Sequence, residues 1–289
     1  MLKHLFQSLR PKQWTKNVIV FAGLFFAEDI FVVEKIFLAV VAFIAFSLVS
    51  SSGYLINDVV DRERDAQHPK KKHRPVAAGK ISPTIAVFTA VILLIATFGG
   101  SFAISRPFTL ILATYLVLTF GYSFGLKHVI ILDVLIIASG FMLRAIGGTI
   151  IISEKLSSWL IICTTFLALF LAINKRRSEF IALGQNAQKT RKTLKKYSIE
   201  LLNQMINTVT SACLISYALY TLDDQTVDKF DTRYLILTLP FVIYGLFRYL
   251  YIVDHKDIGE TPELAILGDK PLVLCVMLFV ITGALVIYF

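Results

Sequence analysis

The sequence predicts an all-α integral membrane protein, a bundle of nine transmembrane helices that forms a single domain over residues 1–289. Of its residues 56% are hydrophobic and 17% are charged, whereas about a quarter of the residues in a soluble domain carry charge. The mean hydropathy is +0.71. The apolar residues form long blocks without a polar face, and a helix that is apolar on all sides is buried or lies in lipid.

Nine of these blocks are long enough to cross a bilayer, because about 20 apolar helical residues span the hydrocarbon core. Helices are favoured over a β-barrel, since lumen-facing and lipid-facing side chains would alternate along the strands of a barrel. The expected spans are residues 15–33, 36–56, 82–104, 107–125, 129–152, 156–174, 199–221, 233–252 and 271–288.

The positive charges predict the orientation of the chain. Of the 29 Lys and Arg residues, 23 lie on one side of the expected membrane and 5 on the other, and Arg144 lies inside a span. Positive residues collect on the cytoplasmic side, so we expect a protein of the inner (plasma) membrane with its N-terminus in the cytoplasm. Topology and contact with anionic lipid explain most of the net charge of +9. We therefore expect membrane lipid, and no nucleic acid, as a partner.

An acidic motif follows the second span. If the helix continues past the membrane surface, Asn57, Asp61 and Asp65 lie at i, i+4 and i+8, and Asp58 lies on the same face. Carboxylates crowded together repel one another unless a cation joins them, and oxygen ligands suit Mg²⁺ that bridges to substrate phosphates. The alternative is a solvated, charged helix end. The clustered acids predict an active site that faces the cytoplasm.

A basic segment comes directly after the acidic motif and includes Lys70 and Arg74. Cations beside a metal-binding cluster suit a diphosphate that is held by both metal and side chains. The positive-inside rule alone accounts for Lys71 and Lys72, but it accounts less well for Arg74, which is placed between turn residues.

The pattern Asn57-Asp58-x-x-Asp61-x-x-x-Asp65, followed by Arg74-Pro75 and Gly79, resembles the first signature of the UbiA superfamily of intramembrane prenyltransferases. The nine expected spans agree with that family. So do three smaller features, which are Tyr122-Ser123 with Lys127, Arg144, and Gly147-Gly148. The resemblance covers essentially the whole chain and implies a UbiA-like helical bundle with Mg²⁺ as cofactor.

One departure from the family's pattern follows the sixth span. Where typical members carry a second Asp-x-x-x-Asp motif, this chain reads Asn174-Lys175-Arg176-Arg177-Ser178-Glu179, so one acid remains and three cations are present. This variant resembles the branch of decaprenyl-phosphate phosphoribosyltransferases. The segments Leu9–Asn17, Tyr217–Thr221, Pro240–Tyr249 and Pro262–Pro271 are also similar to that branch.

The resemblance implies transfer of 5-phosphoribose from phosphoribosyl pyrophosphate to a decaprenyl-type polyprenyl phosphate, with release of diphosphate, for a cell-envelope polysaccharide precursor of cell wall biosynthesis. Three anionic groups would have to be held together, which suits one Mg²⁺ cluster and two basic loops. Two alternatives stay open. One is prenyl transfer from a prenyl diphosphate to an aromatic or glycerol acceptor, and the other is a lipid transporter without catalysis.

The site residues that follow fall into three groups. We expect Asn57, Asp58, Asp61 and Asp65 to bind the metal; Asp58, Asp61, Asp65 and Glu179 to act in catalysis; and Lys16, Lys70, Arg74, Tyr122, Lys127, Arg144, Lys175, Arg176, Arg248 and Lys270 to bind substrate phosphates.

Two ionisable residues near or within spans have alternative interpretations. Arg144 lies within a span, and a charged side chain there is expected to face a polar cavity and to be functional. Its alternative is a structural contact. Asp133 either caps the start of the fifth span or pairs with a cation.

Overall fold

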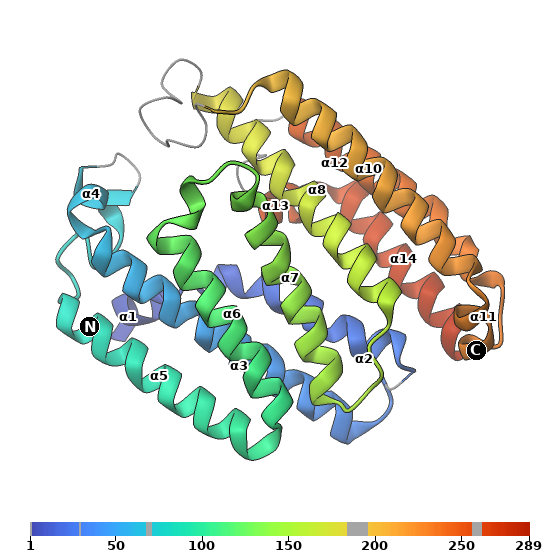
Figure 1. The fold of residues 1–289 in the computed structure, drawn as a ribbon, viewed down its shortest axis with the longest axis horizontal. Coiled ribbons are helices and arrows are strands. Elements are labelled where there is room, and N and C mark those ends of the chain that lie inside the picture. Colours follow the sequence, from blue (N-terminus) through green and yellow to red (C-terminus); the bar gives the residue numbers. More distant parts are fainter. Residues whose placement is uncertain (1, 29, 68–70, 184–195, 256–261) are drawn as a thin grey trace. The chain divides into compact units, whose positions relative to one another are not determined.

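The computed structural model describes residues 2–28, 30–67, 71–183, 196–255 and 262–289, and across these ranges the chain is helical and contains no strand. Within these described ranges, eight helices are long and apolar enough to cross a membrane. They are α3 (Val33–Val60), α5 (Pro83–Ile104), α6 (Arg106–Phe124), α7 (Leu132–Ile151), α8 (Ser158–Leu183), α10 (Ile199–Leu222), α12 (Leu239–His255) with the preceding turn η6 (Tyr234–Thr238), and α14 (Lys270–Tyr288) (Figure 1). The all-α, multi-pass fold class is therefore confirmed.

The expected first span, residues 15–33, does not form a long α-helix. Residues Pro11–Phe21 form a 3-10 helix, η1, and Ala22–Phe26 form the short helix α2. Eleven residues at about 2.0 Å each and five at about 1.5 Å give a length of about 30 Å, which is the thickness of a hydrocarbon core. The count of nine spans therefore holds only if this 3-10 segment is counted with the eight α-helical spans.

Close packing in the N-terminal unit explains why this segment forms a 3-10 helix, which is more tightly wound than an α-helix. A Cβ atom on Gly148 would lie 2.0 Å from the carbonyl oxygen of Val20, so only glycine lets α7 approach η1 this closely. On its other side, η1 bonds to serines of α3. Trp14 Nε1 donates to Ser51 Oγ at 3.1 Å, and the Asn17 amide donates to Ser47 Oγ at 2.9 Å. These contacts satisfy polar groups that would be costly in lipid.

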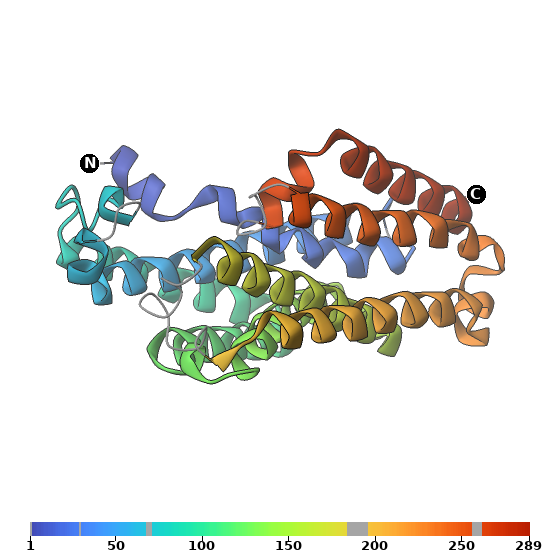
Figure 2. The same cartoon turned by 90° about the horizontal axis from the view of Figure 1, so that it is seen from above.

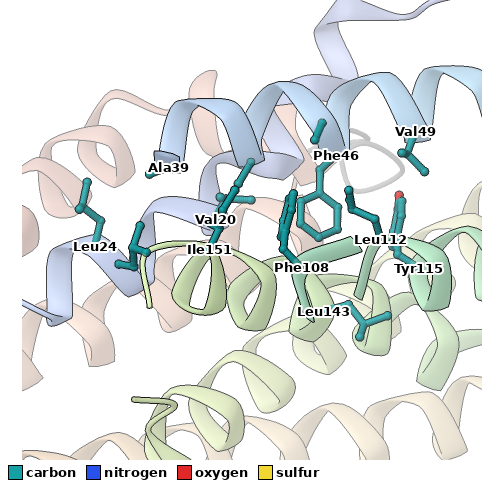
Figure 3. Close-up of a cluster of buried hydrophobic side chains, with 13 residues drawn as sticks. Val20, Leu24, Ala39, Phe46, Val49, Phe108, Leu112, Tyr115, Leu143 and Ile151 are labelled. Carbon is teal, nitrogen blue, oxygen red and sulfur yellow. The ribbon is translucent and has the colours of Figure 1, made fainter. Parts of the chain in front are cut away.

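The chain forms two compact units, and the first comprises residues 1–125 and 143–156. Within it, α3 packs against α5, α6 and η1 (Figure 1). Its core includes an aromatic group in which the ring of Phe46 meets Phe108 and Tyr115 edge-on, with centroids 5.9 and 5.4 Å apart. Figure 3 shows these rings between α3 and the helices that carry Leu112 and Leu143.

Serine and proline start two spans of this unit, α5 and α6. Ser82 accepts a hydrogen bond from the Ile85 amide at the start of α5, and Pro83 occupies the first turn. Ser105 ends α5 and caps α6, again with a proline, Pro107, in the first turn. A hydroxyl cap satisfies a helix amide that has no partner within the helix, and proline fits the first turn because it lacks a donor.

The second unit comprises residues 126–142 and 157–289. In it α8 lies beside α10 and α12 lies beside α14, as Figure 2 shows. Phe170, Cys213, Tyr249 and Leu272 belong to one of its buried clusters. The short helices α11 (Asp224–Phe230) and α13 (Pro262–Leu267) connect the spans.

Large apolar side chains cover the outward faces of the spans. Phe88, Ile95 and Leu110 are 65–68% exposed, although each is strongly hydrophobic. An aqueous protein rarely presents so many apolar residues over whole helices. Together with the hydropathy of the eight spans, these faces identify a multi-pass membrane protein.

Candidate active site

The acidic motif lies where α3 passes into the short helix α4 (Arg62–Ala66). Asp61 stands between the two helices, yet the helical bonding pattern continues through it. Its amide donates to the Asn57 carbonyl at 2.9 Å, and the Asp65 amide donates to the Asp61 carbonyl at 2.8 Å. The i, i+4, i+8 spacing therefore corresponds to successive backbone turns.

Asp58 and Asp65 are buried carboxylates that share one arginine. They are 1% and 2% exposed, and Arg74 Nη1 lies 3.1 Å from Asp58 Oδ1 and 2.6 Å from Asp65 Oδ2. Arg10 donates to the same oxygen of Asp58. Buried charges persist in proteins when they are paired, and here two guanidinium groups compensate two carboxylates.

The loop after α4 holds Arg74 in place. The Arg74 amide donates to the Lys71 carbonyl at 2.9 Å, which closes the 3-10 turn η2 (Lys71–His73), and the Arg74 carbonyl accepts from Ala78 at 2.8 Å. Val76 is fully buried and anchors the loop. Gly79 has φ +70°, a left-handed conformation that favours glycine. Arg74 and Gly79 of the family motif therefore each have a structural role in this loop.

Arg10 was not among the expected site residues. Its backbone is left-handed, with φ 55°, and it precedes Pro11 at the start of η1. Its guanidinium also lies over the ring of Tyr54, 4.7 Å from the centroid. A non-glycine residue in this conformation costs about 1–3 kcal/mol, and the ion pair with Asp58 offsets that cost. The only sequence signal was its place in the Leu9–Asn17 segment.

The remaining acidic and basic groups of this site are more exposed. The Asp61 carboxylate is 20% exposed and lies 3.8 Å from Arg64, while Lys71 lies 4.0 Å from Asp65. Lys70 falls outside the described residues. In the described ranges no three His, Cys, Asp or Glu side chains converge as a metal site. The cations that form hydrogen bonds to the buried carboxylates of Asp58 and Asp65 are arginines. The donor set of three carboxylates and one amide oxygen still suits Mg²⁺ by its chemistry.

A second charged cluster lies within the C-terminal unit. Arg176 of α8 is 1% exposed; its Nε donates to Asp133 Oδ2 of α7 at 2.8 Å, and its Nη1 donates to Glu179. Asp133 is completely buried, so of its two alternatives the structure has the ion pair with a cation. The expected phosphate ligand Arg176 is therefore enclosed between two carboxylates.

Tyr197 completes this cluster from the segment before α10. Its hydroxyl donates to Asp133 Oδ1 at 2.8 Å and accepts from the Ile131 amide at 2.9 Å. Burial raises the pKa of the Tyr197 phenol to about 12, and the neighbouring Asp133 carboxylate acts in the same direction. The phenol thus stays neutral and remains a donor at physiological pH. No spacing in the sequence pointed to this residue.

Arg144 is buried in the N-terminal unit. Its Nε donates to the Asn17 side-chain oxygen at 2.6 Å, and its Nη2 donates to the Tyr115 hydroxyl at 2.7 Å. These bonds join α7 to η1 and α6. These contacts of the intramembrane arginine hold elements of the fold together, and its expected role in phosphate binding stays a prediction.

Two more expected ligands lie near the C-terminus of the chain. Arg248 forms a two-pronged ion pair with Asp269, with both N–O distances at 3.0 Å. Asp269 also caps α14 by accepting from the Leu272 amide at 3.1 Å. Arg248 thus links α12 to the start of α14. Lys270 is exposed in the first turn of α14.

The other expected phosphate ligands are partly exposed and lie on different elements. Lys16 lies on η1, Tyr122 near the end of α6, Lys127 on η3 (Leu126–His128) and Lys175 on α8; all four are half-buried.

Comparison with known proteins places the whole chain in one family. The model of the UbiA prenyltransferase family matches residues 17–267. The decaprenyl-phosphate phosphoribosyltransferase of Corynebacterium glutamicum is 35% identical over 98% of this chain and 86% of its own length. The proteins of the same name from Mycolicibacterium smegmatis and Mycobacterium tuberculosis are 33% and 30% identical, over 100% and 98% of this chain and 94% of their own lengths.

Solved structures agree in fold. A UbiA homolog from Archaeoglobus fulgidus, bound to GPP and Mg²⁺, superposes with a TM-score of 0.73 over 99% of this chain and 100% of its own, at 19% identity. A digeranylgeranylglyceryl phosphate synthase gives a TM-score of 0.70 at 18% identity, over 100% of this chain and 99% of its own. With the acidic motif, the helical spans and these matches together, the chain belongs to the UbiA prenyltransferase family.

Proposed function

We propose that this protein transfers 5-phosphoribose from phosphoribosyl pyrophosphate to a polyprenyl phosphate and releases diphosphate. The observation that carries the proposal is the near full-length similarity, at 30–35% identity, to relatives named decaprenyl-phosphate phosphoribosyltransferase. An oxygen of the lipid phosphate forms a bond to the anomeric carbon while the bond from that carbon to the diphosphate breaks. The acceptor is already ionised, so the step needs no protein nucleophile and no proton transfer.

The acidic site of the N-terminal unit is proposed to hold the diphosphate. Asn57, Asp58, Asp61 and Asp65 would supply the oxygen ligands for Mg²⁺, and the bound metal would neutralise charge on the leaving diphosphate. Asp61 is the most accessible of the three carboxylates, since the other two are buried against arginines. The solved UbiA homolog with GPP and Mg²⁺ is consistent with such a cofactor in this fold.

Arg74 and Arg10 bring positive charge to the same place. Their guanidinium groups bond to Asp58. A diphosphate offers more negative charge than a carboxylate, and arginine binds phosphate oxygens through two parallel bonds. We expect the diphosphate to compete with Asp58 and Asp65 for Arg74, with Lys16 and Lys70 as further cations. The acids thus hold the arginine in position before the substrate arrives.

In the C-terminal unit we assign different tasks to neighbouring residues. Lys175 is proposed to contact a phosphate of the donor or of the acceptor. Arg176 is a positioning residue, because Asp133 and Glu179 enclose it. Glu179 keeps an exposed side-chain fraction of 20% and stays a proposed site residue. Tyr122, Lys127 and Lys270 are proposed phosphate contacts. Arg144 and Arg248 also hold elements of the fold together, and they stay predicted phosphate contacts.

The membrane topology forms part of the proposal. The distribution of Lys and Arg supports an N-terminus in the cytoplasm and an inner (plasma) membrane location. The acidic site follows the C-terminal end of α3. With the N-terminus inside, that end faces the cytoplasm, where phosphoribosyl pyrophosphate is available. The product would then serve the synthesis of a cell-envelope polysaccharide.

The test compares two donors on the purified protein. Labelled phosphoribosyl pyrophosphate with polyprenyl phosphate, and a labelled prenyl diphosphate with an aromatic acceptor, are incubated with Mg²⁺, and the label in each product is counted. We expect label from phosphoribosyl pyrophosphate in the lipid phase, and none after chelation of Mg²⁺. Label from the prenyl diphosphate alone would overturn the proposal and leave only the fold.

A matched pair of variants tests the metal site. Asp61→Ala removes an accessible carboxylate from the acidic face, and we expect about a tenfold to hundredfold loss of activity with insertion unchanged. Glu63→Ala removes an exposed acid two residues further on, in the short helix α4, and should leave activity unchanged. Equal activity of both variants would remove Asp61 from the site.

A further inference from the structure

A polar pocket and an apolar groove meet on helix α12 of the C-terminal unit. The pocket, of about 460 Å³, is lined by Asn174, Arg177, Asn203, Ile206, Asn207, Leu250, Tyr251, Asp254 and His255. The groove, of about 470 Å³, is lined by Pro240, Ile243, Tyr244, Phe247, Arg248 and Tyr251. Tyr251 lines both, so the two hollows adjoin at this residue of one helix.

The pocket is separate from the charged cluster of Arg176. Both residues lie on α8, but the Arg176 side chain bonds to Asp133 of α7, whereas the Arg177 side chain bonds to residues of α10 and α12. Arg177 Nε donates to the Asn203 side-chain oxygen and its Nη2 donates to Asp254 Oδ1, both at 2.8 Å. Successive helix positions point in different directions, so α8 separates the two sites.

Among the described residues, the pocket presents the cation of Arg177, the anion of Asp254 and several amides near the ends of three spans, with the His255 ring 4.0 Å from Asp254. The Asp254 side chain is 57% exposed, and the Arg177 side chain is 18% exposed, so a ligand reaches both. Asn203 and Asn207 lie one turn apart on α10, exposed within a span. Polar side chains in a membrane span are costly and mark functional sites. The balance of charge suits a ligand that carries both a negative and a positive group.

The groove suits a hydrocarbon chain. Its side chains Tyr244, Phe247 and Tyr251 are about half exposed and follow one stripe of the helix. Pro240 and Tyr251 are eleven residues apart, about 16 Å at about 1.5 Å per residue. This is about half of a hydrocarbon core of about 30 Å, which is the depth of one leaflet. The polar pocket lies at the end of this stripe, where α12 reaches His255.

We propose that this groove and pocket bind one zwitterionic aminophospholipid from the bilayer. Its phosphate contacts Arg177 and the amides of Asn203 and Asn207, its ammonium contacts Asp254, and one acyl chain follows α12. An anionic phospholipid places no positive group beside Asp254. A polyprenyl phosphate likewise lacks an amine and carries more negative charge, so Asp254 disfavours both. The site is thus distinct from acceptor binding.

Native mass spectrometry of the full-length protein in detergent tests this inference. Phosphatidylethanolamine, phosphatidylglycerol and a polyprenyl phosphate are added singly and in competition, and the retained lipid is measured. We expect at least about tenfold preference for phosphatidylethanolamine, the size of one charge-assisted contact. Asp254→Asn keeps an oxygen acceptor for Arg177 but removes the anion, so the preference should shift to phosphatidylglycerol. Arg177→Gln should lose retention of both phospholipids.

Two matched controls accompany these variants. Arg233→Gln removes an exposed arginine from the other end of the same span, and Phe88→Ala removes an exposed phenylalanine from α5. Both should retain lipid as the unmodified protein does, while Phe247→Ala should retain less. Equal retention of the two phospholipids, an unchanged preference in Asp254→Asn, or preferred retention of polyprenyl phosphate would overturn the inference.

Discussion

Removing Arg176 distinguishes a structural role from a substrate-binding role for the basic segment in the C-terminal part of α8. Its side chain is 1% exposed and lies between Asp133, which is fully buried, and Glu179. In Arg176→Met the methionine fills much of the space, but the carboxylate of Asp133 stays buried without its cation. Breaking a buried ion pair by removing one partner costs about 3–5 kcal/mol. The free energy of unfolding of a typical protein is about 5–15 kcal/mol, so this substitution would remove a large part of the stability.

A second substitution should restore most of this loss. In Arg176→Met/Asp133→Asn no buried charge is left, and the new amide oxygen still accepts the hydrogen bond from Tyr197. Replacement of a whole buried ion pair by neutral groups is often close to neutral in free energy. We therefore expect the free energy of unfolding of the double variant to lie within about 1 kcal/mol of that of the unmodified protein. The unfolding temperature of the single variant should be roughly 10 °C lower than that of the unmodified protein.

The assay pairs thermal unfolding in detergent with label transfer from phosphoribosyl pyrophosphate to the lipid. If Arg176 positions its neighbours, the double variant regains activity together with stability. Lys175→Ala should show the opposite pattern, because loss of one charge-assisted phosphate contact lowers activity about tenfold to hundredfold, while the half-exposed lysine leaves no buried charge behind and the unfolding temperature falls much less than in Arg176→Met. A double variant that is stable but as inactive as the single variant would refute our assignment and return Arg176 to the substrate.

Three further predictions concern packing, protonation and topology. Gly148→Ala should destabilise the protein by about 1–3 kcal/mol or more in thermal unfolding, because its Cβ meets a backbone oxygen at 2.0 Å, whereas Gly99→Ala, which meets nothing within 4 Å, should not. The pKa of the Tyr197 phenol is raised from 10.0 to about 12 in the folded state, so its stabilising effect is complete below pH 10 and is lost as the pH rises towards 12. The stability difference between the protein and Tyr197→Phe should therefore shrink across that interval, and a constant difference would contradict the assignment. A reporter fused after Lys192 should read cytoplasmic and one after Asp228 external; identical locations would show that the number of spans between them is even.

The class of the protein and the position of its acidic motif follow from local sequence properties. Long apolar blocks predicted eight spans that are α-helices in the structure, since a helix in lipid satisfies its own backbone groups whatever its neighbours are. The spacing of Asn57, Asp61 and Asp65 predicted a helical continuation, and i to i+4 backbone bonds are present there. Hydropathy could not distinguish the 3-10 form of residues 11–21, because it depends on the close approach of Gly148.

The partners of the charged residues were decided by tertiary structure. The sequence by itself determined a multi-pass helical membrane protein with carboxylates and cations near helix ends, and the family motif that these residues form. It did not determine that Arg10 and Arg74 would neutralise Asp58, or that Asp133 would enclose Arg176 from 43 positions away. Such pairs join different elements, so the helical spacing of residues along the sequence cannot predict them. They form because a charge removed from water must find a counter-charge wherever the packed helices bring one within reach.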